Sequence, residues 1–165
     1  MFKGYDFLEE LLESNKEFKD IIDKYIDEGK IRKFNDNEWD KIKEQNYISN
    51  IDNVNSFYDM FSLGYNKGNC VGMSMQLSYS YDNVDIVSGT LPILKGTLNA
   101  EKEGGHCWLE TNNSIIDTSL LLVIDKSLKD IMGYNEEQRI TARELKISNR
   151  YQARKEFTND KNLRK

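Results

Sequence analysis

The chain changes character near residue 83, from a half patterned as helix to a half patterned as strand. Before that point apolar residues recur three or four positions apart, as in the run from Phe7 to Ile26, which is the spacing of amphipathic helices. After it, β-branched residues alternate with polar ones, first in the segment 84–91. A run of helices followed by a run of strands is typical of an α+β domain. The patterns therefore predict a small antiparallel sheet with helices packed on it.

The first half is expected to hold several separate helices. Ser14-Asn15-Lys16-Glu17 has the form of a capping box and divides the stretch 5–28 into two helices, and Gly29 is a suitable stop. Trp39 stands on the next helix and is interpreted as a core anchor, in preference to a ligand platform. The further helices are predicted at residues 36–45, 51–63 and 70–81.

The second half predicts strands joined by short turns. Pro92 and the run 95–105 are expected to form loop. Asn112-Asn113 lies between two β-like runs, which is a hairpin signal. Residues 140–147 fit either a last strand or part of a helix. The remaining predictions are strands at 84–91 and 106–110, a strand or a strand pair at 114–124, and helices at 126–132 and 149–157.

Length and hydropathy restrict the class of protein. The 165 residues most simply form one domain, with a helical part at 5–63, a core at about 64–125 and a C-terminal extension at 126–165. The longest apolar run, 120–124, is far too short to span a bilayer, and the N-terminus has no signal-peptide core. We therefore expect a cytoplasmic protein with no membrane partner and with its two cysteines as thiols. The oligomeric state stays open.

Charge is unevenly distributed along the chain. Residues 139–165 hold nine Lys and Arg against three Asp and Glu, whereas the whole chain has a net charge of −5. A basic tail suits nucleic acid or another acidic partner, or a solvated terminal helix that faces water and the acidic body. Because no aromatic stacking pattern or nucleic-acid motif accompanies the charge, we favour the solvated helix and expect no nucleic-acid partner.

Residues that carry chemistry gather in the stretches 68–74 and 105–117. Cys70 stands at a predicted helix start, where exposed N–H groups and the helix dipole favour a thiolate. His106, the only histidine, stands on a predicted strand, and Asp117 follows across the hairpin, where a carboxylate can orient the imidazole. This order of nucleophile, base and orienting acid predicts covalent catalysis through a cysteine.

Each of these residues also has an ordinary structural interpretation. Cys70 alone fits a small buried core residue, a lone histidine on a strand is usually structural, and Asp117 alone fits a turn. Together they favour catalysis, because an aspartate inside an apolar β run needs a partner. His106 and Trp108 share one face of the strand while Cys107 faces the other, so Cys107 is assigned to the core. The cysteines and the histidine are too few and unsuitably spaced for a metal site.

The two stretches resemble a known family. GNCxxxS leading a helix, then HxWxE on a strand and a short hairpin to an aspartate, is similar to the transglutaminase-like branch of the papain-like cysteine enzymes. The resemblance covers about residues 64–120 and implies a papain-like α+β fold. It also implies the roles of Cys70 as nucleophile, His106 as base and Asp117 as orienting acid. The interval of eleven residues from His106 to Asp117 is closer to compact bacterial peptidase-like members than to the large crosslinking enzymes.

The family often adds an oxyanion-hole side chain from upstream of the cysteine. Asn66, Asn69 and Tyr65 are the candidates here, although turn formation explains both asparagines equally well. Trp108 is a further candidate, either at the substrate-binding site or as a shield of His106 from water.

The sequence thus favours an enzyme that acts on amide bonds of a protein or peptide substrate through an acyl-enzyme, without a cofactor. A cysteine peptidase or isopeptidase is the first hypothesis, and transamidation or deamidation of glutamine is the next. The competing class is a binding module that keeps the fold without catalysis. The intact Cys, His and Asp argue against it, because a decayed site usually loses one member. Acetyl transfer from an acyl-CoA would need a cofactor pocket that the sequence does not reveal.

Overall fold

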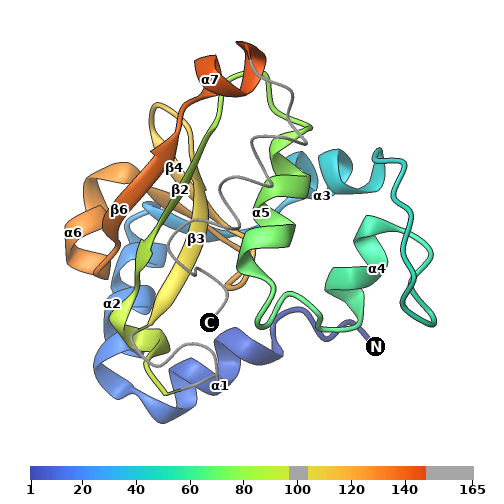
Figure 1. Cartoon of the computed structure of the whole chain (residues 1–165). Coiled ribbons are helices and arrows are strands. Elements are labelled where there is room, and N and C mark those ends of the chain that lie inside the picture. Colours follow the sequence, from blue (N-terminus) through green and yellow to red (C-terminus); the bar gives the residue numbers. More distant parts are fainter. Residues whose placement is uncertain (97–103, 148–165) are drawn as a thin grey trace.

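A six-stranded antiparallel sheet forms the centre of the protein (Figure 1). The computed structural model describes residues 1–96 and 104–147. The strands are β1 (Ile31–Lys33), β2 (Asp85–Thr90), β3 (Gly105–Glu110), β4 (Ser114–Asp117), β5 (Leu122–Asp125) and β6 (Asn135–Ile140). Their order in the sheet is β1-β5-β4-β3-β2-β6, and each neighbouring pair is antiparallel. The predicted α+β class is confirmed.

Five helices precede β2 in sequence, and the last two helices are short. The helices are α1 (Asp6–Ser14), α2 (Lys16–Asp27), α3 (Asp36–Lys43), α4 (Phe57–Ser62), α5 (Cys70–Ser78), α6 (Lys129–Met132) and α7 (Ala142–Ile147), and the 3-10 turns are η1 (Pro92–Leu94) and η2 (Lys126–Leu128). Within the described part of the chain, no helix has both the length and the apolar character to cross a membrane.

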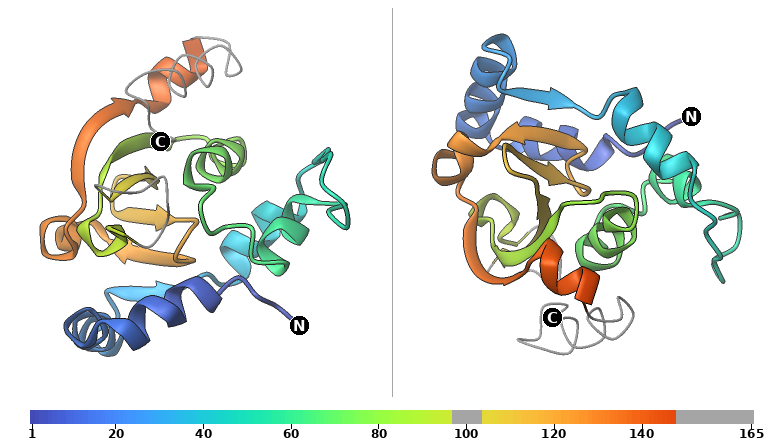
Figure 2. Two further views of the ribbon diagram at one scale, coloured as in Figure 1. Left: turned by 60° about the horizontal axis from the view of Figure 1, so that its bottom comes forward. Right: turned by 90° about the horizontal axis from the view of Figure 1, so that it is seen from above.

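Two hydrophobic cores lie on opposite faces of the sheet. One joins α1 and α2 to the sheet and includes Phe7, Ile22 and Trp108. The other joins α3, α4 and α5 to the opposite face and includes Phe61 and Leu109. Figure 2 shows α1 and α2 beside β1, with α5 across the sheet from them. Because side chains alternate along β3, Trp108 and Leu109 enter different cores, as predicted.

Polar side chains define where three of the helices begin. Asn15 accepts a hydrogen bond from a first-turn N–H of α2, and Ser56 does the same for α4. Asn35 and Glu38 form a capping box at α3. The predicted division of the N-terminal helical stretch is therefore confirmed, with Asn15 as the cap of the second helix in place of Ser14.

The prediction of one helix over 51–63 is wrong in its first half. Asn53 has a φ of 68°, a left-handed conformation that cannot continue a right-handed helix. The helix α4 starts only after Ser56, the residue that caps it. The next helix, predicted over 70–81, ends at Ser78. Apolar spacing thus identified both helices but not their ends.

The outer strands β1 and β6 were not predicted. The strand β1 has three residues, and β6 (NEEQRI) is polar and partly exposed, so neither shows an apolar alternation. The segment 140–147, whose pattern fits either a strand or a helix, contains the end of β6 and then α7. The helix predicted at 149–157 lies outside the described residues, as does most of the basic tail.

The hairpin of β3 and β4 lies at the middle of the sheet. Leu109 pairs with Ile116, and the connecting turn contains residues 112–113, as predicted. The helix α5 packs directly on β3, where the Ser74 hydroxyl donates to the backbone oxygen of Cys107 at 3.4 Å. The helix that begins with a cysteine is therefore held against the strand that carries the histidine.

Candidate active site

Cys70 lies at the start of a helix whose first backbone N–H groups receive no hydrogen bond acceptor from the N-cap side chain. Cys70 is the first residue of α5, and Asn69 occupies the N-cap position. The Asn69 amide donates to the backbone oxygen of Tyr65 and accepts no hydrogen bond from the helix. The first N–H groups of a helix have no intrahelical partner. Those of α5 are therefore available to a ligand beside the sulfur of Cys70.

His106 joins Cys70 to Asp117. Its Nε2 donates to Asp117 Oδ2 at 2.8 Å, and its ring also hydrogen-bonds the Cys70 side chain. Because Nε2 is engaged by the carboxylate, Nδ1 is the ring nitrogen left for the sulfur. The structure thus brings all three predicted residues together, in the order sulfur, imidazole, carboxylate. All three are buried: Cys70 is 5% exposed, His106 3% and Asp117 0%.

Close backbone packing around the start of β3 depends on two glycines. Gly89 lies opposite His106 in the sheet, and a Cβ there would come within 1.8 Å of the backbone oxygen of Asn135. Gly104 has a φ of +75°, and a Cβ there would lie 2.7 Å from the backbone oxygen of Leu91. Glycine at these two positions therefore allows β2 to lie close to β6, and allows the residue that precedes β3 to lie close to the residue that follows β2.

Asp117 accepts hydrogen bonds at both carboxylate oxygens. The backbone N–H groups of Ser119 and Leu120 donate to Oδ1 at 2.9 and 3.0 Å. The Tyr134 hydroxyl donates to Oδ2 at 2.7 Å, the same oxygen that His106 uses. Each of these donors favours the ionised carboxylate and fixes its orientation.

The charged forms of His106 and Asp117 stabilise each other. Burial by itself would lower the pKa of His106, but the charge of Asp117 and hydrogen bonds to Asp117 and Cys70 hold that pKa well above 6.5. Burial by itself would raise the pKa of Asp117, but His106 and the hydrogen bonds from Tyr134 and the Leu120 N–H keep it below its usual value. The imidazolium and carboxylate forms are therefore both favoured, which suits a base that must hold a proton taken from a thiol.

Tyr134 is a site residue that sequence reasoning missed. It is fully buried, and burial together with the charge of Asp117 holds the pKa of its hydroxyl well above 10.0. The hydroxyl therefore remains a donor to Asp117. Its ring packs against Trp108, with centroids 4.9 Å apart. Tyr134 follows Gly133 and stands 17 residues from Asp117, so no spacing in the sequence linked the two.

Trp108 does not lie where a substrate could touch it. The side chain is fully buried, and its indole N–H donates to Glu110 at 2.8 Å. Its ring lies 6.0 Å from that of His106, between centroids. The prediction of a substrate-binding role is corrected, because the indole supports the His106 side of the sheet from the core.

Asn66 also has a structural role. Its side-chain amide donates to the backbone oxygens of Gly4 and Ser119, both at 2.9 Å, so neither N–H is left for an oxyanion. This contact fixes the turn whose Ser119 N–H binds Asp117. The prediction of Asn66 as an oxyanion donor is corrected for this reason. Asn69 keeps its place next to Cys70.

Glu110 is a second buried carboxylate on the same face of β3. Lys129 and Arg139 lie 2.8 and 2.7 Å from its oxygens, and Lys126 lies at 3.3 Å. Burial would raise the pKa of Glu110, but hydrogen bonds from Lys129, Trp108 and Arg139 lower it to about 2. Arg139, at the start of the basic segment 139–165, is thus paired with the acidic body of the protein.

Cys107 lies in the core on the α5 face of the sheet and is fully buried, as strand alternation predicts. Both cysteines are thiols. Among the described residues, no three His, Cys, Asp or Glu side chains are grouped as metal ligands.

Comparison with known proteins assigns neither a family nor a function to this site. No protein-family model, curated protein or solved structure matches the chain. Inference about function therefore depends on Cys70, His106, Asp117 and the groups around them.

Proposed function

We propose that the protein is a cysteine enzyme of the papain-like, transglutaminase-like type that cleaves amide bonds in a protein or peptide. Cys70 is the nucleophile, His106 the general base and acid, and Asp117 the residue that orients His106. The observation that carries the proposal is the continuous contact from the Cys70 side chain through His106 to Asp117 Oδ2.

The arrangement of elements supports the papain-like assignment. Cys70 begins a helix that packs on the sheet, and His106 and Asp117 follow it in sequence on the adjacent antiparallel strands β3 and β4. The same residue types in a turn or an apolar core would not need this mutual contact.

In the proposed mechanism His106 Nδ1 takes the proton of the Cys70 thiol. The thiolate attacks the carbonyl carbon, a sulfur–carbon bond forms, and the carbonyl electrons move to oxygen. His106 then gives its proton to the leaving nitrogen as the carbon–nitrogen bond breaks, which leaves an acyl-enzyme on Cys70. Asp117 holds the imidazole in position and stabilises its positive charge throughout.

The oxyanion of the tetrahedral intermediate would lie at the first turn of α5. The backbone N–H groups there point away from the helix and are not capped by Asn69. Preorganised N–H donors and the positive end of the helix dipole stabilise such a charge. Asn66 is not needed for this role, since both of its N–H groups are already bonded.

Water resolves the acyl-enzyme in a peptidase or isopeptidase, whereas an amine resolves it in a transamidase. In either case His106 activates the incoming group. Hydrolysis is the proposed reaction. A glutamine transamidase or deamidase would use the same first half-reaction.

Acylation of the protein by p-nitrophenyl acetate tests the proposal. We expect an initial release of p-nitrophenolate and an acetyl group on Cys70, located by mass spectrometry. Cys70→Ala and His106→Ala should lose both signals, while Cys107→Ala should keep them. If no adduct forms on the wild type, or if it forms equally in His106→Ala, the proposal is contradicted and the non-catalytic binding module is favoured. Adding glycinamide shows whether the acetyl group passes to water or to an amine.

A further inference from the structure

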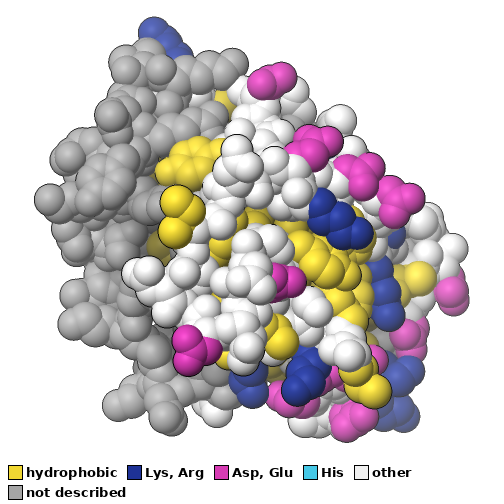
Figure 3. Space-filling view, turned by 90° about the vertical axis from the view of Figure 1, so that its right-hand side faces the viewer, with side chains coloured by type: hydrophobic (Ala, Val, Ile, Leu, Met, Phe, Trp, Pro, Cys, Tyr) yellow, Lys and Arg dark blue, Asp and Glu magenta, His cyan; other side chains and the backbone are white. Residues whose placement is uncertain are grey.

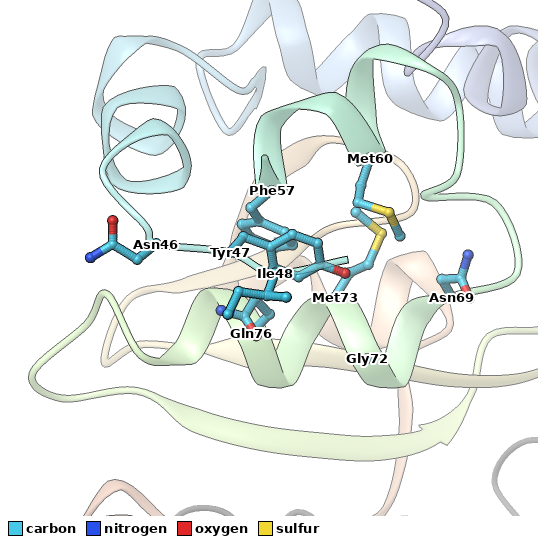
Figure 4. Close-up of a pocket in the computed structure, with 9 residues that line it drawn as sticks. All are labelled: Asn46, Tyr47, Ile48, Phe57, Met60, Asn69, Gly72, Met73 and Gln76. Carbon is cyan, nitrogen blue, oxygen red and sulfur yellow. The ribbon is translucent and has the colours of Figure 1, made fainter. Parts of the chain in front are cut away.

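A groove of about 480 Å³ runs along the outer face of the helix that begins with Cys70 (Figure 4). One wall is the helix itself, at Asn69, Gly72, Met73 and Gln76, positions that share one face. The opposite wall is formed by α4 and by residues 46–48. Figure 4 shows Tyr47, Ile48, Phe57 and Met60 gathered over α5, with Asn46 further away and Asn69 at the start of the helix.

The lining of the groove is apolar in the middle and carries amides at the two ends of the helix face. Phe57 is 1% exposed, Met60 6% and Met73 2%, so the apolar parts of the two walls are held in place by packing. Asn69 and Gln76 stand at the two ends in Figure 4. Among the described residues, no charged side chain lines the groove, although 31% of the residues of the chain are charged. This lining suits an uncharged occupant with an apolar side chain and an amide backbone.

This side of the molecule also exposes apolar surface. Hydrophobic side chains gather in the middle of the face shown in Figure 3, with acidic and basic ones around them. At the rim of the groove Ile48 is 92% exposed, which leaves a large apolar side chain in water. Burial of such a side chain against a partner is favourable.

The groove begins at the same end of α5 as the nucleophile, although Cys70 itself faces His106 and does not line it. Asn69 directly precedes Cys70, and Gly72 lies in the first turn of α5. A Cβ built at Gly72 would meet no atom within 4 Å, so the missing side chain leaves this end of the groove open. At a rise of 1.5 Å per residue, the helix face from Asn69 to Gln76 is about 10 Å long, enough for about three residues of an extended peptide.

The far end of the groove is fixed by a pair of glutamines. The Gln76 amide donates to Gln45 Oε1 at 2.6 Å, and the Gln45 amide donates to Ser80 Oγ at 2.8 Å. On the wall, Tyr47 packs against Phe57 with centroids 5.5 Å apart. These contacts make the groove a preformed feature, which lowers the cost of ordering it around a ligand.

We propose that this groove binds an uncharged peptide segment of the substrate, and that it selects a large apolar side chain close to the carbonyl that Cys70 attacks. This inference rests on the proposed function. It adds a substrate class, peptides with an apolar residue near the scissile bond, and it assigns specificity to Gly72, Met73 and α4.

Two peptidyl chloromethyl ketones, identical except for leucine or aspartate next to the reactive group, test the inference. In this reaction the Cys70 sulfur displaces chloride and forms a carbon–sulfur bond. We expect wild-type protein to react with the leucine probe on the order of ten times faster or more than with the aspartate probe, since burial of one large apolar side chain is worth at least that factor. Iodoacetamide, which has no side chain to bind, measures the reactivity of Cys70 separately.

Filling the groove provides the second arm of the test. Gly72→Leu should lower the ratio of the leucine-probe rate to the iodoacetamide rate by about tenfold, and Gly72→Ala should lower it less. Asp20→Leu, which places the same side chain on an exposed position of α2, should leave the ratio as in the wild type. Circular dichroism checks that each variant is folded.

Failure of the inference about the groove can be distinguished from failure of the proposed function. Suppose that Cys70 reacts fast with iodoacetamide, but the two peptidyl probes react at equal rates or the ratio is unchanged in Gly72→Leu. The inference that the groove binds the substrate is then wrong, and the proposed function stands. Slow reaction of Cys70 with every reagent overturns the proposed function and the groove together.

Discussion

Two carboxylates buried in the same sheet, Asp117 and Glu110, are compensated in different ways. Glu110 meets the permanent cations Lys129 and Arg139, with Lys126 nearby. Asp117 meets neutral donors, and within residues 1–96 and 104–147 its only ionic partner is His106, whose charge depends on its protonation. The charge of Glu110 is therefore balanced in every state, whereas that of Asp117 is balanced only while His106 holds a proton.

The difference separates a structural carboxylate from one coupled to proton transfer. A buried charge with fixed counter-charges holds elements together: here Glu110 ties β3 to α6 and β6. A buried charge opposite a titratable partner favours the transfer of a proton to that partner, in this case from Cys70 to His106. The comparison predicts that removing Asp117 affects chemistry most and that removing Glu110 affects stability most.

Asp117→Asn is expected to produce the largest effect. An asparagine keeps the size of the side chain but no longer stabilises the imidazolium, so the rate of Cys70 acylation should fall on the order of 10³- to 10⁴-fold. Acylation by p-nitrophenyl acetate measures this rate. If Asp117→Asn were acylated as fast as Glu110→Gln, the contrast between the two carboxylates would be wrong.

Glu110→Gln should mainly lower stability. The three cations lose their counter-charge but are partly solvated, so we expect a loss on the order of 2 kcal/mol in the free energy of unfolding, measured by urea denaturation. The pKa of Glu110 is about 2 in the folded protein against an ordinary 4.5. Its contribution is therefore present above about pH 4.5 and is lost as the pH falls through about 2.

Acylation of folded Glu110→Gln should proceed at close to the wild-type rate. A loss of acylation as large as that in Asp117→Asn, with the fold retained, would place Glu110 in the chemistry and contradict the assignment.

Tyr134→Phe sharpens the comparison because it removes one neutral donor and leaves the charges in place. Without the hydroxyl, Asp117 has one donor fewer, becomes more basic and holds the proton on His106 more strongly. The alkaline limb of the pH–rate profile should therefore move to higher pH. The acylation rate should fall roughly 3- to 10-fold, within the net worth of one ordinary hydrogen bond, because Tyr134 acts on the reaction only through Asp117. A lower melting temperature with an unmoved profile would show that Tyr134 acts only in packing.

The smallest expected effect is in the pH dependence of stability. Because the folded pKa of His106 is raised, its contribution is complete below the unfolded value of about 6.5 and is lost as the pH rises through the folded pKa. The pKa of Asp117 is lowered, so its contribution is lost in acid instead. The difference in unfolding free energy between wild type and His106→Gln should therefore shrink toward alkaline pH. The difference for Glu110→Gln should stay level there, and parallel curves for the two variants would contradict this assignment.

The sequence allowed the prediction of the residues whose chemistry is local. Cys70 was placed by its helix start, and His106 and Asp117 by strand alternation and a short hairpin. Alternation also separated Cys107 from Trp108 correctly. These patterns depend on positions a few residues apart, which a single sequence displays directly.

Partners that depend on distant pairing were not predictable. Tyr134 reaches Asp117, and Arg139 reaches Glu110, only because the chain passes from α6 into β6 at the sheet edge. The polar sequence of β6 gives no strand signal. The role of Asn66 was missed for a similar reason, since its acceptors Gly4 and Ser119 are more than fifty positions away.

The most direct test of the central claim is the pH dependence of Cys70 alkylation by iodoacetamide, in wild type and in His106→Gln. If His106 takes the thiol proton, wild-type Cys70 should react at about pH 6 roughly 100-fold faster than the variant, whose rate should rise only toward alkaline pH, as for an ordinary thiol. Cys107 is fully buried and should stay unlabelled in both, which reports that the fold is intact. Coincident profiles for the two proteins would contradict the account.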